Sequence, residues 1–250
     1  KMLRPYFIHH RHLLGDLCRL AYETVRELMA EVVSDEPSFR PGMVAVIQTF
    51  GSRLNVNPHV HAIVSRGGWL ADGHFVSVLQ VDPHAAELLF RHKVLKLLKR
   101  HDLIDDHRIG VLLSWHHTGF SIHNGVGIDR DDGPAIERLA RYVMRSPVSL
   151  ERIHYDEDAD QVTYALKGSH PSSAPHDAHE PDAIAEETLD AREFVARVLV
   201  HIPEPKLHLA HYYGAYSSLL RARRRKLGCS AGMPAEPRDV PPPSARRRLW

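Results

Sequence analysis

The stretch "MVAVIQTFGSRLNVNPHVHAIVS", residues 43–65, contains two apolar runs rich in β-branched residues, separated by residues typical of turns. Residues 43–50 are almost continuously apolar, which predicts a buried strand. Residues 51–58 supply glycine, asparagine and proline, and residues 59–65 then predict a second strand. Together the two runs predict an antiparallel β-hairpin, around which the rest of the fold is built.

Helical periodicity surrounds this hairpin. Apolar residues at helical spacing predict helices over residues 11–33, 82–100, 134–145 and 191–202. The second begins with an aspartate N-cap and a first-turn proline, and the third lies between Pro134 and Pro147. Residues 119–128 predict a further strand, and residues 151–168 a further hairpin. Strands interleaved with helices around an antiparallel hairpin predict an α+β fold.

Composition narrows the classes of protein. The chain has 250 residues, of which 43% are hydrophobic and 25% charged, as in ordinary globular proteins. Its apolar runs are all shorter than the roughly 18 to 20 residues of a transmembrane helix. Cys18 and Cys229 lie far apart and form neither a zinc pattern nor a disulfide framework. We therefore expect a cytoplasmic protein with no membrane partner.

The net charge of +1 conceals an uneven distribution. "RARRRK" at residues 221–226 and "ARRRLW" at residues 245–250 are basic, whereas residues 176–188 are acidic. Clustered arginine is typical of proteins that bind a polyanion such as nucleic acid, although a solvated tail has the same composition. The first cluster makes Arg223, Arg224 and Arg225 candidate DNA contacts.

Two histidines stand at the start of the second strand. Along a strand, residues two apart point to the same face, about 6.6 to 6.8 Å from each other. His59 and His61 can therefore direct both imidazoles at one ion while Val60 packs on the opposite face. Gln48, near the end of the first strand, can supply a third donor through hairpin pairing. The chain contains 20 histidines, so a chance triplet and a solvent-facing glutamine are the alternatives.

A second candidate site lies in "ERLARYVMR", residues 137–145. On a helix, Arg138 and Arg145 would share a face with Tyr142, and Arg141 would be adjacent. A tyrosine between guanidinium groups is well placed to meet a phosphate. The alternative is an amphipathic surface tyrosine.

Four segments, in their order along the chain, resemble those of a known protein family: "AVIQTFGSRLNVNPHVHAIVSRGGW", "SWHHTGFSIHNGV", "LARYVMRSPVSLERI" and "HLAHYYGAYSS". They resemble the bacterial rolling-circle transposases of the HUH superfamily, in the group related to insertion-sequence common-region elements. The resemblance implies an HUH-type antiparallel sheet flanked by helices. In that fold, a central strand carries the histidine pair, and a helix lays the nucleophilic tyrosine over a metal.

The resemblance also implies a reaction and a set of roles. His59 and His61 match the metal-binding pair, Tyr142 matches the nucleophile, and Gln48 as third ligand is our inference from the hairpin. The implied enzyme uses Mg²⁺ or Mn²⁺ to cut single-stranded DNA at transposon ends, and it forms a 5′-phosphotyrosine before strand transfer. It would act at the nucleoid and could be a homo-oligomer. A rolling-circle replication initiator or relaxase, or an inactive DNA-binding remnant, are the alternatives.

The sequence departs from the two-tyrosine members of this superfamily. Arg138 stands where their first tyrosine would be, and Arg145 stands at their lysine position. We therefore expect a one-tyrosine enzyme. Tyr212 and Tyr216 also show the four-residue spacing and are the competing candidates for the nucleophile.

These patterns predict four parts of the chain, which we expect to be a fragment of a longer protein. A catalytic core spans residues 1–166, and a disordered acidic insertion spans residues 167–188. A helical part of the catalytic region follows over residues 189–227 and forms a basic C-terminal extension. Residues 228–250 form a tail rich in proline and arginine.

Overall fold

The predicted hairpin is present as strands β1 (Arg40–Phe50) and β2 (Val56–Trp69). The computed structural model describes residues 2–33, 36–78, 80–129, 131–165, 186–205 and 207–226. β1 and β2 pair antiparallel, from Arg40 opposite Trp69 to Phe50 opposite Val56. The second strand begins before its predicted start at His59, so the turn is shorter than residues 51–58.

Two short strands complete a four-stranded antiparallel sheet in the order β3-β2-β1-β7. β3 (Phe75–Ser77) pairs with the end of β2, and β7 (Ala210–Gly214) pairs with the free side of β1. β7 lies within residues 189–227, which we predicted to be helical, so that prediction is wrong for this segment. Five residues are too few for a clear period of two, and pairing with β1 determines the strand.

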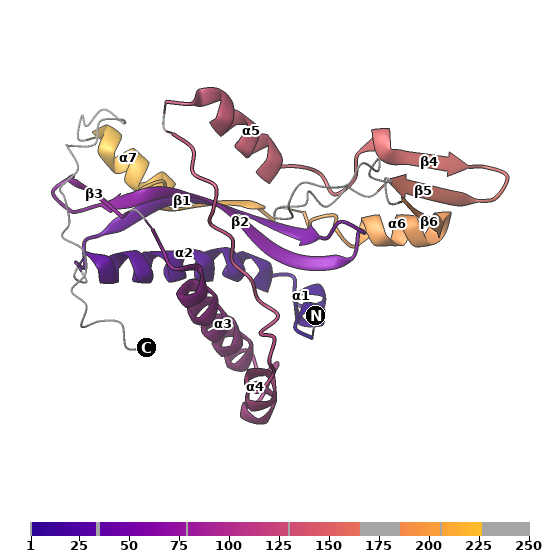
Figure 1. The fold of residues 1–250 in the computed structure, drawn as a ribbon, viewed down its shortest axis with the longest axis horizontal. Helices are drawn as coiled ribbons and strands as arrows, with labels where there is room; N and C mark the ends of the chain where they lie inside the picture. Colours follow the sequence, from indigo (N-terminus) through magenta and orange to yellow (C-terminus); the bar gives the residue numbers. More distant parts are fainter. Residues whose placement is uncertain are drawn as a thin grey trace, which may run out of the picture.

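Four helices precede the middle of the chain: α1 (Arg4–His9), α2 (Leu13–Val32), α3 (Pro83–Arg100) and α4 (Asp106–Leu113). α2 and α3 lie on one side of the sheet (Figure 1). The side chains of Met43, Ala45 and Ile47 on β1 join the core cluster formed with the apolar stripes of these helices. Because strand residues alternate between faces, Val44, Val46 and Gln48 belong to the opposite face.

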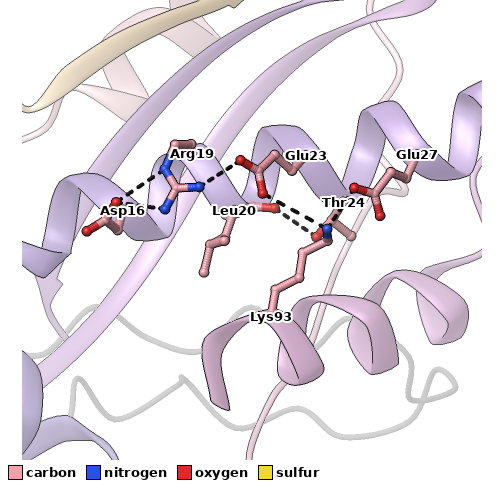
Figure 2. A network of polar contacts seen from close by, with 7 residues as sticks. All are labelled: Asp16, Arg19, Leu20, Glu23, Thr24, Glu27 and Lys93. Atoms are coloured by element: carbon pink, nitrogen blue, oxygen red, sulfur yellow. Dashed lines mark hydrogen bonds and ion pairs between the residues drawn. The ribbon is translucent and has the colours of Figure 1, made fainter. Parts of the chain in front are cut away.

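An ionic network crosses from α2 to α3 outside this core (Figure 2). Arg19 contacts Asp16 at 2.9 Å and Glu23 at 2.7 Å, one turn away on either side. Lys93 of α3 contacts Glu27 of α2 at 2.8 Å. Exposed pairs of this kind each contribute about 0.2–1 kcal/mol, so the apolar interface holds the two helices together and the network fixes their register.

The opposite side of the sheet carries α5 (Gly133–Val143), which Figure 1 shows across β1 and β2 from α2. Asp132 caps this helix by accepting a hydrogen bond from the Ala135 backbone N–H, and Pro134 lies in its first turn. The helix ends at Val143, before the predicted Arg145. Met144 already departs from helical geometry at φ −94° and ψ 9°, and Pro147 keeps the helix from resuming, because the residue before a proline avoids helical geometry.

A smaller unit combines the sheet β4-β5-β6 with helix α6 (Ala191–Leu199). β4 (Ile153–Asp156) and β5 (Gln161–Ala165) form the predicted hairpin after a 3₁₀ turn, Leu150–Arg152. Leu54 reaches from the β1–β2 turn into its core at a left-handed φ of 53°. Burial of this side chain offsets the backbone strain and ties the hairpin turn to the smaller unit.

Two further predictions differ from the structure. Residues 119–128 form no strand: Val126 is 79% exposed, and Gly125 and Gly127 have no side chain to pack against a neighbouring strand. β6 (Glu186–Asp190) lies partly within residues 167–188, the predicted insertion, so its last residues belong to a sheet. The rest of the insertion and the tail at residues 228–250 lie outside the described residues.

The α+β class is confirmed, with helices against a four-stranded antiparallel sheet. α7 (Ser218–Lys226) follows β7 and carries the first arginine cluster. Across the described ranges, every helix is too short or too polar to cross a lipid bilayer.

Candidate functional site

His59 and His61 lie on the sheet face that is turned away from α2. Their register partners on β1 are Gln48 and Val46, respectively. The pairing is irregular between Gln48 and Phe50, where Pro58 sits in β2 without an N–H to donate. The Nε2 atoms of the two histidines lie 3.1 Å apart, so both rings converge on one point.

A backbone contact fixes the proton of His59. Its Nδ1 lies 2.7 Å from the carbonyl oxygen of Asn57, which can only accept, so Nδ1 carries the hydrogen and the Nε2 lone pair faces Nε2 of His61 at 3.1 Å, from which it can accept. Burial lowers the pKa of His59, and the charge of Arg145 lowers it further against the opposing Asn57 contact. Burial, His59 and Arg145 lower the pKa of His61 to about 4. Both imidazoles are therefore neutral at pH 7, the form that binds metals.

Gln48 lies beside this pair and is almost fully buried, at 4% exposure. Its Nε2 donates to the carbonyl oxygen of Val143 at 2.7 Å, which fixes the orientation of the amide. Its Oε1 is buried and has no hydrogen-bond partner among the residues that the structure describes. An unpaired buried carbonyl costs about 1–3 kcal/mol, so this oxygen has lone pairs available for a ligand.

The donor set of two imidazole nitrogens and one amide oxygen fits a divalent ion. Two nitrogens bound at about 2.1 Å and at right angles would lie about 3.0 Å apart, close to the 3.1 Å between His59 and His61. Mixed N/O sites of this kind accept Mg²⁺ or Mn²⁺, and imidazole also accepts zinc. Among the described residues, no group of three or more histidine, cysteine, aspartate or glutamate side chains is placed to hold a metal. The amide of Gln48, the register partner of His59, is the candidate for the third donor.

Tyr142 stands over the histidine pair from the last turn of α5. Its ring centroid lies 5.6 Å from that of His61, with the ring planes at 82°, and its side chain remains 44% exposed. The bond from Gln48 to Val143 attaches the end of α5 to the sheet at the next residue. The glutamine predicted as the third ligand is therefore bonded to the residue next to Tyr142.

The three arginines predicted around Tyr142 lie in different environments. Arg145, just beyond α5, places its guanidinium 4.9 Å from the Tyr142 ring centroid and 5.7 Å from that of Phe50. Its Nε is buried and has no hydrogen-bond partner within the described part of the chain. Arg138 is exposed on α5, and Arg141 is exposed and contacts Glu137 at 2.7 Å. The side chains of Arg223, Arg224 and Arg225 on α7 lie outside the described part of the chain.

The competing tyrosines lie elsewhere. Tyr212 is opposite Val44 on β7, and Tyr216 follows the end of that strand. The ring of Tyr216 packs so closely on Gly42 that a Cβ built there would lie 2.7 Å from it. The structure thus brings together His59, His61, Gln48, Tyr142 and Arg145. Within the sheet, the histidines lie on β2 along one edge of β1, whereas Tyr212 and Tyr216 lie on or after β7 along its other edge.

The sequence patterns did not predict several residues that lie around this site. Asn57 holds His59, and Arg4 in turn donates to the Asn57 Oδ1 atom at 2.6 Å. Phe50 lies between the rings of His59 and His201, at centroid distances of 6.5 and 5.9 Å. Alternation from Gln48 could have identified Phe50. Arg4 and His201 are distant in sequence and gave no local signal.

Comparisons with known proteins match the part of the chain that contains this site. A family model described as "Putative transposase" matches residues 42–226, a range that contains every residue of the cluster. The transposase for insertion sequence element IS801 from Pseudomonas savastanoi pv. phaseolicola is 26% identical over 245 residues, which cover 85% of this chain and 51% of that protein. The chain spans about half the length of this curated relative. No solved structure matches the chain.

Proposed function

Because the chain belongs to the family described as "Putative transposase", we propose that it cuts and rejoins one strand of DNA through Tyr142. The observation that carries the proposal is the position of Tyr142 over His61, beside a glutamine oxygen that is buried and unpaired. The proposed substrate is single-stranded DNA at the ends of a transposable element. The proposed outcome is strand transfer in rolling-circle transposition.

In the first step, the Tyr142 hydroxyl oxygen attacks a backbone phosphorus atom. A bond forms between that oxygen and phosphorus, and the bond to the 3′ oxygen of the preceding nucleotide breaks. The tyrosine proton passes to solvent, and the departing oxygen takes up a proton as a 3′ hydroxyl. The DNA 5′ end is then held as a phosphotyrosine, and attack by another 3′ hydroxyl reverses the step without ATP.

A tyrosine hydroxyl is a weak nucleophile at neutral pH, because the ordinary pKa of a phenol is about 10. His59, His61 and Gln48 are the residues that would hold Mg²⁺ or Mn²⁺. Such an ion, when bound, polarises the scissile phosphate and stabilises the charge that develops on it. The Asn57 carbonyl keeps the His59 Nε2 lone pair available, and the Gln48–Val143 bond keeps Tyr142 above that position.

Arg145 has a different role in this proposal. Its guanidinium stacks on Tyr142, and its buried Nε has no partner among the described residues. A phosphate oxygen that approaches Tyr142 can accept from the guanidinium of Arg145, which is only partly buried as a residue, so Arg145 would orient the scissile phosphate. Arg138 and Arg141 are exposed on the same helix and would contact neighbouring phosphates.

A single nucleophile limits the reaction to one attached DNA end at a time. Arg138 occupies the position one helical turn before Tyr142, where a second tyrosine would have to stand. An exposed arginine cannot form a phosphodiester, but its guanidinium can bind a DNA phosphate next to the phosphate that Tyr142 attacks.

The test is an adduct assay with an end-labelled single-stranded oligonucleotide and Mn²⁺, analysed under denaturing conditions. We expect a protein–DNA adduct that survives denaturation, requires the metal and is absent with duplex DNA. A replication initiator or relaxase would give the same adduct but would require its own origin sequence. Binding without any adduct, across oligonucleotides from the element's ends, would identify a DNA-binding remnant and reject the proposal.

Arg223, Arg224 and Arg225 are proposed as further phosphate contacts. Each contact to single-stranded DNA contributes about 0.7 to the slope of log affinity against log salt. Replacing all three with glutamine should therefore reduce the slope by about 2. Binding isotherms at several salt concentrations measure it, and an unchanged slope would assign these residues to a solvated helix face.

A further inference from the structure

A second tyrosine lies on the sheet face that carries the histidine pair. Tyr212 is the register partner of Val44, which alternates on β1 with Val46 and Gln48. Its neighbour Tyr213 points the other way and stacks on Tyr22 of α2 at 5.2 Å. The ring of Tyr212 therefore lies on the same face as His59, His61 and Tyr142.

An arginine covers this ring as well. The guanidinium of Arg221 on α7 lies 5.1 Å from the Tyr212 ring centroid, while the tyrosine remains 49% exposed. A tight turn after β7 brings the helix back over the strand. Gly214 makes the turn at a left-handed φ of 55°, and a Cβ there would lie 1.8 Å from the Pro41 carbonyl oxygen. The Ala215 N–H donates to that same carbonyl at 3.1 Å, so the turn is fixed to β1.

Sheet geometry gives the separation between this pair and the candidate site. His61 is opposite Val46 on one side of β1, and Tyr212 is opposite Val44 on the other. Two strand spacings across and two residues along correspond to about 12 Å. A stacked DNA strand rises about 3.4 Å per nucleotide, so roughly three or four nucleotides cover that distance. A strand held at Tyr142 can reach Tyr212 along one face of the sheet.

We propose that Tyr212 and Arg221 form a single-stranded DNA subsite, in which one base stacks on the tyrosine ring and the guanidinium contacts the adjoining phosphate. Exposed aromatic rings beside arginine are the recognition elements of proteins that bind single strands without sequence preference. The subsite rests on the proposed function, because it holds the strand that Tyr142 attacks. It requires the ring of Tyr212 and not its hydroxyl.

That requirement separates the subsite from a nucleophile. Tyr212→Phe retains the ring and should retain the affinity for single-stranded DNA. Tyr212→Ala removes it and should weaken binding roughly 5- to 150-fold, the range found for loss of one stacked base. Arg221→Ala should weaken binding less and should reduce the salt dependence by about one phosphate contact.

The experiment measures affinity for a fluorescent oligonucleotide with EDTA present, so that no cleavage occurs. Tyr155→Ala is the matched control, because Tyr155 is equally exposed at 50% but lies on the smaller sheet. Each oligonucleotide in a series carries one abasic site at a successive position. For the unaltered protein, one position should weaken binding more than its neighbours, and in Tyr212→Ala that extra loss should disappear.

The outcomes distinguish failure of the proposed function from failure of the Tyr212–Arg221 subsite. If the unaltered protein fails to bind single-stranded DNA, the proposed function fails. If it binds, and Tyr212→Ala binds equally well or shows the same abasic profile, the subsite alone is rejected. Should Tyr212→Ala fold poorly by circular dichroism, the abasic profile of Tyr212→Leu decides, because leucine fills the space without an aromatic ring. Loss of the position-dependent effect there supports the subsite, and an unchanged profile overturns it.

Discussion

Two tyrosine–arginine pairs lie on one face of the central sheet, and their local geometry is nearly the same. Arg145 lies 4.9 Å from the Tyr142 ring and Arg221 lies 5.1 Å from the Tyr212 ring. The two tyrosines are 44% and 49% exposed. The two pairs differ in the residues of the sheet that lie next to each tyrosine. Tyr142 lies against the imidazole of His61, whereas Tyr212 is paired through the backbone with Val44.

The comparison teaches that the residue pair alone does not specify the chemistry. An arginine stacked on a tyrosine is suited to bind a strand of DNA at either place. Only at Tyr142 do two neutral imidazoles and an unpaired amide oxygen lie close by. We therefore propose bond cleavage at the first pair and strand binding at the second.

The largest expected effect is the loss of adduct formation in Tyr142→Phe. Only the hydroxyl is removed, so the fold and the affinity for DNA should be kept while the rate falls at least about a thousand-fold. The denaturing adduct assay measures it. Tyr216→Phe is the control and should remain active, because its ring packs on Gly42 away from the histidines. If the Tyr142→Phe enzyme still formed the adduct, Tyr142 would not be the nucleophile and the distinction between the two pairs would fail.

Next in size is the effect of the proposed ligands. The double variant His59→Ala/His61→Ala should abolish metal-dependent cleavage without unfolding the protein, since both side chains lie on the face turned away from the core. Gln48→Leu should weaken Mn²⁺ binding about 10- to 100-fold, and Gln48→Glu should restore it through a carboxylate oxygen. Calorimetric titration with Mn²⁺ measures both. Equal Mn²⁺ affinity in the unaltered protein and the double variant would contradict the site.

The two arginines near Tyr142 should differ in effect. Arg145→Ala should slow adduct formation about 10- to 100-fold, because Arg145 contacts the Tyr142 ring and has a buried unpaired Nε. Arg138→Ala should slow it only a few-fold, because that side chain is exposed on α5. Single-turnover rates at saturating DNA measure the difference. The reverse order would place the phosphate on the Arg138 side of the tyrosine.

The smallest effect concerns stability and pH in the absence of metal. Burial lowers the pKa values of His59, His61 and His201, so the folded state binds fewer protons than the unfolded chain below about pH 6.5. The free energy of unfolding should therefore fall as the pH falls from about 6.5 toward 4. His201→Gln should make this decline shallower and leave Mn²⁺ binding intact. Urea unfolding across this pH range measures it, and an unchanged decline would show that His201 titrates normally.

The hairpin and its histidines were predictable because their signals are local. Alternation places His59 and His61 on one face, and antiparallel pairing brings Gln48 beside them. Helical spacing likewise predicted α2 and α3. These patterns depend only on the geometry of single elements, so no distant contact was needed to find them.

The rest of the site depends on contacts that join distant segments. The Gln48–Val143 bond links residues 95 positions apart, and Arg4 reaches Asn57 across 53 positions. β7 is a strand because β1 offers it an edge, and the run at residues 119–128 pairs with no strand among the described residues. Tyr212 could be noticed in the sequence for its spacing from Tyr216. Its position on the face that carries His59 and His61 follows only from the register with Val44.

The central claim is that Tyr142 alone carries the DNA, and mass spectrometry of the attached peptide tests it most directly. After nuclease treatment and trypsin digestion, the nucleotide should be found on residues 142–145, or on residues 139–145 if the modification blocks cleavage after Arg141. The rival tyrosines lie in a different tryptic peptide, residues 207–221, so the two results cannot be confused. A nucleotide on Tyr142 is the predicted result. A nucleotide on Tyr212 or Tyr216 would contradict the account.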